Sequence, residues 1–283
     1  MGEFGRRVLV ALVAIPIAGY IVYLGGWPFA ILVSVVAGVA AWEFFRIAAA
    51  GGVHAFDKAG PALAALVPLV IHTNRIGVTQ VPLAAAALVL LIIFAAAVFR
   101  RVGERPLAAV AATVFGVLYT GGMLSFAYVL RYHRFVVEDL GGLALLGFPL
   151  VLTFASDTGG YAFGRLFGRR KLYPAVSAGK TVVGSLGGVF LTVVSTWLYV
   201  RFALQPAAQL SLTLTGILVF GVLMSVTAQI GDLAESLLKR EAGVKDSSHL
   251  IPGHGGVLDR FDSMLFVLPV ATVLLTELLI ATP

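Results

Sequence analysis

The residues best suited to chemistry lie together in one charged window of an otherwise apolar chain. Residues 229–262 hold six of the 14 Asp and Glu residues, four of the 20 Lys and Arg residues, and two of the five histidines. Charged side chains are costly beside hydrocarbon, so an apolar chain that concentrates them in one segment usually does so for function. This window is therefore the first place to look for a catalytic or binding site.

Three aspartates in this window have the chemistry of a divalent-cation site. Asp232 lies near the start of the window, and Asp259 and Asp262 lie three residues apart near its end, so in a helix these two share one face. Carboxylates from two helices suit a hard cation such as Mg²⁺, especially one shared with a polyphosphate. Helix capping and ion pairing with Arg240 and Arg260 would explain a single carboxylate. Three carboxylates that flank a glycine-rich turn favour the metal site.

The turn between these aspartates, residues 252–256, reads Pro-Gly-His-Gly-Gly. Glycines such as Gly255 and Gly256 let backbone N–H groups approach a phosphate, and a loop that enters a helix N-terminus is a natural anion site. A plain tight turn explains the glycines equally well. His254 could orient a phosphate or a metal-bound water, although a single interfacial histidine is more often a hydrogen-bonding partner. Basic residues near the turn could neutralise a triphosphate or only anchor the cytoplasmic side: Lys239, Arg240, Lys245 and Arg260.

A second polar segment covers residues 156–184 and begins with Asp157 at the end of an apolar run. Gly179-Lys180-Thr181 looks like the end of a nucleotide-binding P-loop, but Pro174 stands where that motif needs glycine, and we expect no strand before it. The P-loop interpretation is therefore excluded. A Lys-Thr pair among glycines can still hold phosphate, and a flexible basic loop explains the segment equally well.

The elements that must position these residues are predicted to be membrane helices. The chain has 59% hydrophobic and 12% charged residues, outside the range of soluble domains. Since about 20 apolar residues cross a bilayer as a helix, we expect an all-α, polytopic integral membrane protein with about nine transmembrane helices. The first run lacks a cleavage signature and is interpreted as a retained span. The apolar runs are residues 8–24, 28–48, 59–72, 81–99, 107–130, 141–156, 185–203, 212–231 and 263–281.

The distribution of Lys and Arg predicts the orientation. With the N-terminus in the cytoplasm, 16 of the 20 basic residues fall on the cytoplasmic side, which is the positive-inside bias. This orientation places two polar loops, 157–184 and 232–262, in the cytoplasm. We expect residues 1–140 to be N-terminal scaffold helices and 141–283 to be the catalytic transmembrane region. The net charge of +6 does not indicate nucleic-acid binding, because no soluble basic domain is present and anionic lipid headgroups explain it.

A charged pair in the second apolar run and the absence of cysteine complete the sequence analysis. Glu43 and Arg46 lie three residues apart beside Trp42 and are interpreted as an interfacial ion pair. The chain has no cysteine, which excludes disulfides, thiolate nucleophiles and cysteine metal sites.

Residues 236–262 resemble the signature of the phosphatidate cytidylyltransferases, the CDP-diacylglycerol synthases. The matching pieces, in order, are Ser-x-Leu-Lys-Arg, Lys-Asp, Ser, Ile-Pro, His-Gly-Gly-Val and Asp-Arg-Phe-Asp. Ser-Asp-Thr-Gly-Gly-Tyr at 156–161 and the glycine-rich run at 177–188 are similar to the same family. In the second run, family members commonly have Pro, Lys and Glu where this chain has Ala178, Gly179 and Val183. These departures leave the functional weight of Lys180 and its neighbours to be tested.

The resemblance implies that CTP and phosphatidic acid react to give CDP-diacylglycerol and pyrophosphate with Mg²⁺, as one or two cations. It also implies a homodimer, embedded among lipids of a bacterial inner (cytoplasmic) membrane, with the site facing the cytoplasm. Metal ligands would be Asp232 and Asp259, with Asp262 and Asp157 as further ligands. The other catalytic residues would be Lys239, Arg260 and His254, and the substrate contacts would be Ser177, Lys180, Thr181, Arg240, Lys245, Gly255 and Gly256.

The implied reaction agrees with the residue types present. A phosphate monoester has a second pKa of about 6, so the lipid phosphate is its own anionic nucleophile and no side-chain nucleophile is needed. Positioning and charge stabilisation remain for the metal and the cations. One alternative is a related CTP-dependent membrane enzyme that acts on another lipid, such as an isoprenoid or archaeal-type acceptor. Others are an ion or phosphate transporter, and a scaffold whose carboxylates are structural.

Overall fold

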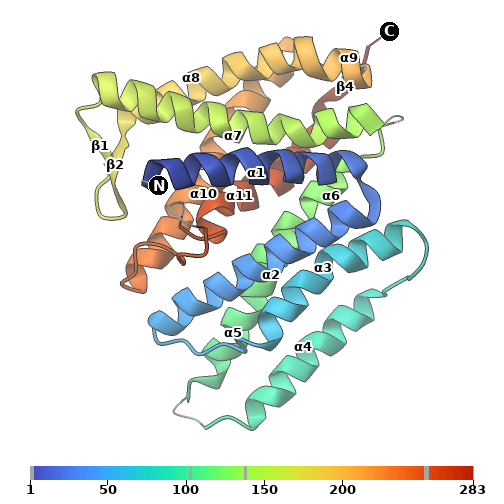
Figure 1. The fold of residues 1–283 in the computed structure, drawn as a ribbon, viewed down its shortest axis with the longest axis vertical. Coiled ribbons are helices and arrows are strands. Elements are labelled where there is room, and N and C mark those ends of the chain that lie inside the picture. The colour runs from blue at the N-terminus through green and yellow to red at the C-terminus, as the bar shows by residue number, and fades with distance from the viewer. Residues whose placement is uncertain (1–2, 102–103, 137–138, 252–254, 283) are drawn as a thin grey trace. The chain divides into compact units, whose positions relative to one another are not determined.

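A computed structural model of the 283-residue chain describes residues 3–101, 104–136, 139–251 and 255–282. Figure 1 shows a mainly helical chain, and its four strands have only three to five residues each, which confirms the predicted all-α class. Among the described residues, six helical segments are long and apolar enough to cross a membrane: Gly26–Ala50, Pro106–Arg131, Asp139–Phe167, Val182–Ala208, Leu214–Glu241 and Leu258–Leu278. Helices also cover the other three predicted spans, but they fall short of these criteria, so the count of nine stays a prediction.

The contacts divide the chain into two compact units, each built from two stretches of chain. The first unit contains Met1–Tyr128 and Leu238–Phe261, and the second contains Val129–Leu237 and Asp262–Pro283. This division differs from the predicted boundary between residues 140 and 141. The reason is that the charged segment 238–261 packs with the N-terminal helices, which periodicity along the sequence cannot reveal.

The first unit is built mainly from six consecutive helical elements that pack through small residues. A Cβ added at Gly121 would lie 2.4 Å from the carbonyl oxygen of Ala64, and one at Gly60 would lie 2.2 Å from the ring of Phe45. Glycine at these points lets neighbouring helices approach closely, as is common between membrane helices. The elements are α1 (Glu3–Leu24), α2 (Gly26–Ala50), α3 (Ala59–Arg75), α4 (Leu83–Val98), α5 (Pro106–Val117) and the π-helix η2 (Leu118–Gly122).

The second unit is organised around two long helices that lie side by side, α7 (Asp139–Phe167) and α8 (Val182–Tyr199). A Cβ at Gly159 of α7 would lie 2.5 Å from the carbonyl oxygen of Gly187 in α8, so the two backbones are nearly in contact. The other elements are β1 (Lys171–Tyr173), β2 (Ser177–Thr181), η3 (Val200–Leu204), α9 (Gln205–Ala208), β3 (Leu210–Leu212), most of α10 (Leu214–Glu241), most of α11 (Leu258–Leu278) and β4 (Leu279–Ala281). The short helix α6 (Phe126–Arg131) crosses from the first unit into this one.

The ranges expected as cytoplasmic loops contain more regular structure than the sequence indicates. Helix α7 continues to Phe167 and α10 continues to Glu241, so the beginnings of the ranges 157–184 and 232–262 are helical. Apolar periodicity stops where a helix leaves the hydrocarbon, but its backbone hydrogen bonds do not stop there. The expectation of no strand near Lys180 is wrong, because β2 pairs with β1 in an antiparallel hairpin that places Lys171 opposite Thr181.

Candidate active site

The second unit contains a cavity of about 620 Å³, which we call the Asp232 pocket. Its wall is formed by α7, the β1–β2 hairpin, the first turns of α8, and α10. Two carboxylates and three cations line it: Asp157, Asp232, Arg165, Lys171 and Lys180. Ligand sites commonly have about 300–1,000 Å³ and a few convergent polar groups. This pocket has that size and is rich in charge of both signs.

The centre of the Asp232 pocket is an ion pair between two predicted site residues. Lys180 Nζ of β2 lies 2.7 Å from Asp232 Oδ2 of α10, and the two side chains are 24% and 34% exposed. Lys180 Nζ also donates to the carbonyl oxygen of Gln229 at 3.4 Å. Ser236 Oγ, one turn further along α10, donates to Asp232 Oδ1 at 3.3 Å. Lys180 thus holds the hairpin on α10, and both charges remain accessible from the cavity.

A part-buried polar network forms one part of the pocket wall. Gln229 Nε2 donates to Ser225 Oγ at 3.0 Å and to the carbonyl oxygen of Ser185 at 3.3 Å, while Ser185 Oγ donates to Gln229 Oε1. Ser225 Oγ also shares a hydrogen bond of 2.8 Å with Ser156 Oγ, next to Asp157. These bonds link α7, α8 and α10 beside Asp157 and Asp232, the charged residues of α7 and α10 that line the pocket. The sequence interpretation missed Gln229, since a single glutamine in an apolar run carries little signal.

Thr181 has a structural task at the edge of the same pocket. Its Oγ1 accepts the backbone N–H of Gly184 at 3.1 Å, which makes it the N-cap of α8. Ser177, at the other end of β2, is not among the residues that line the pocket. Of the predicted contacts in this segment, the structure therefore brings Lys180 and Thr181 to the cavity together with Asp157 and Asp232.

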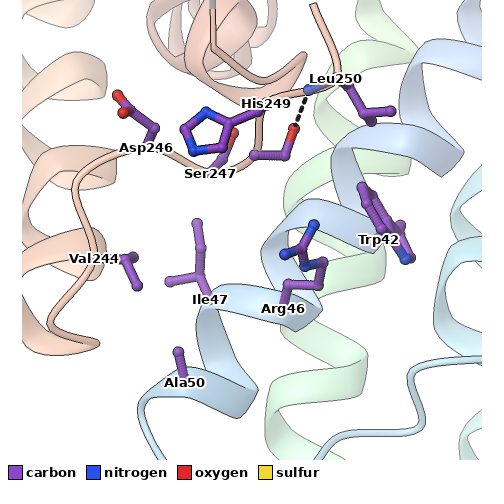
Figure 2. A pocket seen from close by; sticks show the side chains of 10 residues that line it. Trp42, Arg46, Ile47, Ala50, Val244, Asp246, Ser247, His249 and Leu250 are labelled. Carbon is purple, nitrogen blue, oxygen red and sulfur yellow. Dashed lines mark hydrogen bonds between the residues drawn. The ribbon is translucent and has the colours of Figure 1, made fainter.

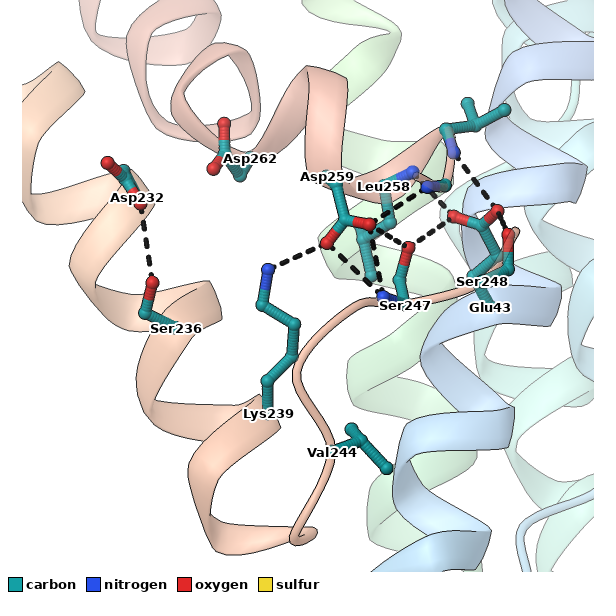
Figure 3. Close-up of polar contacts among 12 residues, drawn as sticks. Glu43, Asp232, Ser236, Lys239, Val244, Ser247, Ser248, Leu258, Asp259 and Asp262 are labelled. Carbon is teal, nitrogen blue, oxygen red and sulfur yellow. Dashed lines mark hydrogen bonds and ion pairs between the residues drawn. The ribbon is translucent and has the colours of Figure 1, made fainter. Parts of the chain in front are cut away.

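The first unit holds a second cluster, centred on Asp259 and shown in Figure 3. Lys239 Nζ donates to Asp259 Oδ1 at 2.6 Å, and the two side chains are 10% and 9% exposed. Ser247 donates to Asp259 Oδ2 through its backbone N–H at 3.1 Å and its hydroxyl at 2.9 Å. Gly256 N–H donates to the same oxygen at 2.9 Å. Both carboxylate oxygens of Asp259 are therefore occupied by donors of the protein itself.

A second carboxylate, Glu43 of α2, lies behind Asp259 in the same unit and is completely buried. Its Oε1 accepts the backbone N–H of Val257 at 3.0 Å and the hydroxyl of Ser248. Its Oε2 accepts the backbone N–H of Leu258 at 2.6 Å and lies 2.9 Å from the hydroxyl oxygen of Ser247, whose single proton it shares with Asp259 Oδ2. Glu43 thus satisfies N–H groups at the N-terminus of α11, which would otherwise lack partners.

The predicted ion pair between Glu43 and Arg46 is not among the contacts of the described residues. Glu43 faces the segment 247–258, and the guanidinium of Arg46 lies 4.8 Å from the centre of the Trp42 ring. Arg46 and Trp42 line a separate cavity of about 380 Å³ at the end of α2 (Figure 2). A single glutamate in an apolar run can indicate a buried polar site. The interpretation of Glu43 as half of an interfacial ion pair did not consider this.

The glycines of the turn serve this cluster. A Cβ added at Gly256 would lie 1.9 Å from Ser247 Oγ and 2.6 Å from Glu43 Oε2. Gly255 has a φ of +82°, and a Cβ there would lie 2.9 Å from Asp259 Oδ2. Only glycine fits either position without displacement of a neighbour. The Gly256 N–H, predicted to contact phosphate, here donates to Asp259.

The remaining predicted residues are placed as follows. Arg240 is exposed and donates to the carbonyl oxygen of Val244 at 3.1 Å, and Lys245 and Arg260 are exposed. Asp262 Oδ1 accepts the backbone N–H of Ser263 at 2.6 Å, in the first turns of α11 that also carry Asp259. His254 lies outside the described residues. Within the described part of the chain, no group of three or more His, Cys, Asp or Glu side chains is arranged to hold a metal.

Comparisons with known proteins show which family and which relatives the chain is similar to. A family model described as the cytidylyltransferase family matches residues 5–278. A phosphatidate cytidylyltransferase of Bacillus subtilis is 32% identical over 95% of this chain and 96% of its own length. Proteins of the same name from Staphylococcus epidermidis and Haemophilus influenzae are 39% and 42% identical over 55% and 50% of the chain. The match to the S. epidermidis protein spans 58% of that protein's length.

Proposed function

Because the chain belongs to the cytidylyltransferase family, we propose that it transfers CMP from CTP to phosphatidic acid, giving CDP-diacylglycerol and pyrophosphate in phospholipid synthesis. The observation that carries the proposal is the Asp232 pocket, where the Lys180–Asp232 pair lies beside Asp157, Arg165 and Lys171. Such a pocket offers cations that can neutralise two anionic phosphates and carboxylates that can hold a metal ion. The relatives named phosphatidate cytidylyltransferase support the choice of acceptor.

The reaction needs no side-chain nucleophile. An oxygen of the lipid phosphate attacks the α-phosphorus of CTP, and the bond from that phosphorus to the bridging oxygen of the β-phosphate breaks, so pyrophosphate leaves with the electron pair. The barrier lies in bringing the anions together and in stabilising charge on the leaving group. We assign this role to Lys180, Arg165 and Lys171, whose side chains line the pocket.

The pocket also fits a magnesium ion bound together with substrate. Mg²⁺ is usually held by one or two carboxylates, water and substrate phosphates. Asp157 and Asp232 provide two carboxylates in one cavity, and Gly231 lets α10 approach α11 so closely that a Cβ there would lie 2.9 Å from the carbonyl oxygen of Asp262. A bound Mg²⁺ would supply charge neutralisation of the triphosphate. One or two cations, with Asp232 as the main ligand and Asp157 and Asp262 as further ligands, form this part of the proposal.

The Asp259 cluster contributes a buried lysine that can turn to a phosphate. Helix α10 carries both Asp232 and Lys239, and the latter is held by Asp259 Oδ1 at 2.6 Å. We assign Lys239 to the triphosphate, together with Arg240, Lys245, Arg260 and His254 of the signature. Movement of Lys239 to a phosphate would leave Asp259 Oδ1 with only the Ser247 N–H at 3.3 Å, and we therefore keep Asp259 as a proposed metal ligand.

The excess of Lys and Arg in segments assigned to the cytoplasm supports a site that faces the cytoplasm, where CTP is available. We propose the inner membrane of a bacterial cell as its location, where the lipid substrate surrounds it. A homodimer is the assembly that we propose.

A related CTP-dependent enzyme with another acceptor lipid is the second candidate. It is favoured by the pocket residue Gly179, which stands with Ala178 and Val183 where the family commonly has Lys, Pro and Glu. Purified protein in detergent with labelled CTP and Mg²⁺ would be offered phosphatidic acid, a polyprenyl phosphate and an archaeal-type lipid phosphate in parallel. We expect labelled product with phosphatidic acid. Product from one of the other lipids alone would replace the proposed substrate.

A further inference from the structure

Glu43 is a completely buried carboxylate whose position the proposed reaction does not explain. Its exposed fraction is 0%, and it comes from α2, far in the sequence from every residue of the signature. Burial of a carboxylate is costly unless hydrogen bonds compensate for lost water. The four donors that surround Glu43 all belong to the segment that carries Asp259. Within the described part of the chain, the hydrogen bonds of this side chain therefore go to residues 247–248 and 257–258.

From this geometry we propose that Glu43 is a positioning residue for Asp259. It acts through Ser247, whose hydroxyl oxygen lies 2.9 Å from Glu43 Oε2 and 2.9 Å from Asp259 Oδ2. It also acts through the Val257 and Leu258 N–H groups, which fix the N-terminal turn of α11 directly before Asp259. The orientation of Asp259, and through it that of Lys239, is thereby set from α2.

The close packing of Gly256 shows that this arrangement tolerates little displacement. The space around its α-carbon is filled by Ser247 Oγ and both carboxylate oxygens of Glu43. Its N–H in turn donates to Asp259 at 2.9 Å. Ser247 and Gly256 thus each contact both carboxylates, so a shift of Glu43 reaches Asp259 by two routes.

The pairing of donors predicts that glutamine cannot replace Glu43. Each carboxylate oxygen accepts one hydroxyl and one backbone N–H. A glutamine has one acceptor oxygen and one NH₂ donor. A serine hydroxyl can rotate to accept from NH₂, but a backbone N–H cannot, so either orientation leaves Val257 or Leu258 without its acceptor. Aspartate keeps both oxygens and the charge but is shorter by one methylene.

The test rests on the proposed cytidylyltransferase activity and compares Glu43→Gln and Glu43→Asp with wild type in the detergent-purified full chain. We expect Glu43→Gln to lower kcat by at least about tenfold, the consequence of one unsatisfied buried donor. Glu43→Asp should recover part of that loss. Ser34→Ala is the matched control, because it removes a buried hydroxyl from the same helix that has no hydrogen-bond partner among the described residues. It should keep wild-type kcat.

A double-mutant cycle separates positioning from general support of the fold. If Glu43 acts through Asp259, Glu43→Gln will cause little further loss of kcat in an Asp259→Asn background. The proposal would be overturned if Glu43→Gln lowered kcat by the same factor in both backgrounds, or if Glu43→Gln kept wild-type kcat. If Glu43→Gln does not accumulate, Ser247→Ala tests the proposal in its place. We expect Ser247→Ala to lower kcat, and the loss to be non-additive with that of Asp259→Asn. An unchanged kcat would refute the positioning of Asp259 through Ser247. An inactive wild-type protein would instead refute the proposed function.

Discussion

A substitution of Lys180 tests whether this residue is only part of a structural ion pair or acts as a cation in catalysis. The substitution Lys180→Gln removes the charge 2.7 Å from Asp232 Oδ2, in a pair whose side chains are 24% and 34% exposed. Accessible ion pairs contribute about 0.2–1 kcal/mol to stability, so the free energy of unfolding should fall by no more than about 1 kcal/mol. A group that stabilises charge in a transition state is worth about 2.7–4 kcal/mol, or a factor of about 100–1,000 in kcat.

The prediction is therefore a loss of activity out of proportion to the loss of stability. Initial rates of CDP-lipid formation would be measured at saturating CTP and phosphatidic acid, alongside the thermal unfolding midpoint in the same detergent. Lys58→Gln is the control, since Lys58 is an exposed cation at the start of α3 outside the proposed site. If Lys180→Gln keeps kcat within about threefold of wild type, Lys180 is not the cation that the reaction uses. A large drop in the unfolding midpoint with a matching loss of activity would show that the pair is structural.

Further predictions concern the glycines, the carboxylates and the cation. Gly256→Ala should destabilise the protein by about 1–3 kcal/mol and abolish activity, because its Cβ would lie 1.9 Å from Ser247 Oγ; an unfolding midpoint equal to that of wild type would contradict this. Gly179→Lys should fold normally and lower the KM for CTP, since a Cβ at Gly179 meets nothing within 4 Å; an unchanged KM would deny this position a role. Asp232→Asn should raise the Mg²⁺ concentration needed for half-maximal rate at least about tenfold, and an unaltered Mg²⁺ titration would remove Asp232 as a ligand. Removal of divalent cations with a chelator should abolish product formation until Mg²⁺ is restored, and turnover without any divalent cation would exclude the metal.

The sequence predicted the helical class because helix formation depends on a local signal, whereas Lys180 and Asp232 were assigned to one site only through the family resemblance. Apolar run length determines where helices occur, and charge in such a chain is rare enough to mark a site. The hairpin β1–β2 was missed because its residues, Ser-Ala-Gly-Lys-Thr among them, have weak strand preference and pair only through their mutual contact.

The arrangement around Glu43 could not be predicted for a different reason. Glu43 and Ser247 are 204 residues apart, and no period or motif connects an apolar N-terminal run with a polar C-terminal segment. A glutamate in an apolar run indicates that Glu43 has a polar partner, but the sequence does not show that this partner is Ser247. The same holds for Gly255 and Gly256, whose sequence fits a phosphate loop or a plain tight turn equally well, while their packing shows a close fit around Asp259 and Glu43.

The central claim, transfer of CMP to a lipid phosphate, is tested most directly by the fate of label from two forms of CTP. Purified protein would receive phosphatidic acid and Mg²⁺ with CTP labelled either at the α-phosphate or at the γ-phosphate. The account predicts that α-label enters the lipid fraction and γ-label appears only in pyrophosphate, with equal molar amounts of the two products. Label from the γ-phosphate in the lipid, or no label in the lipid from either substrate, would contradict it.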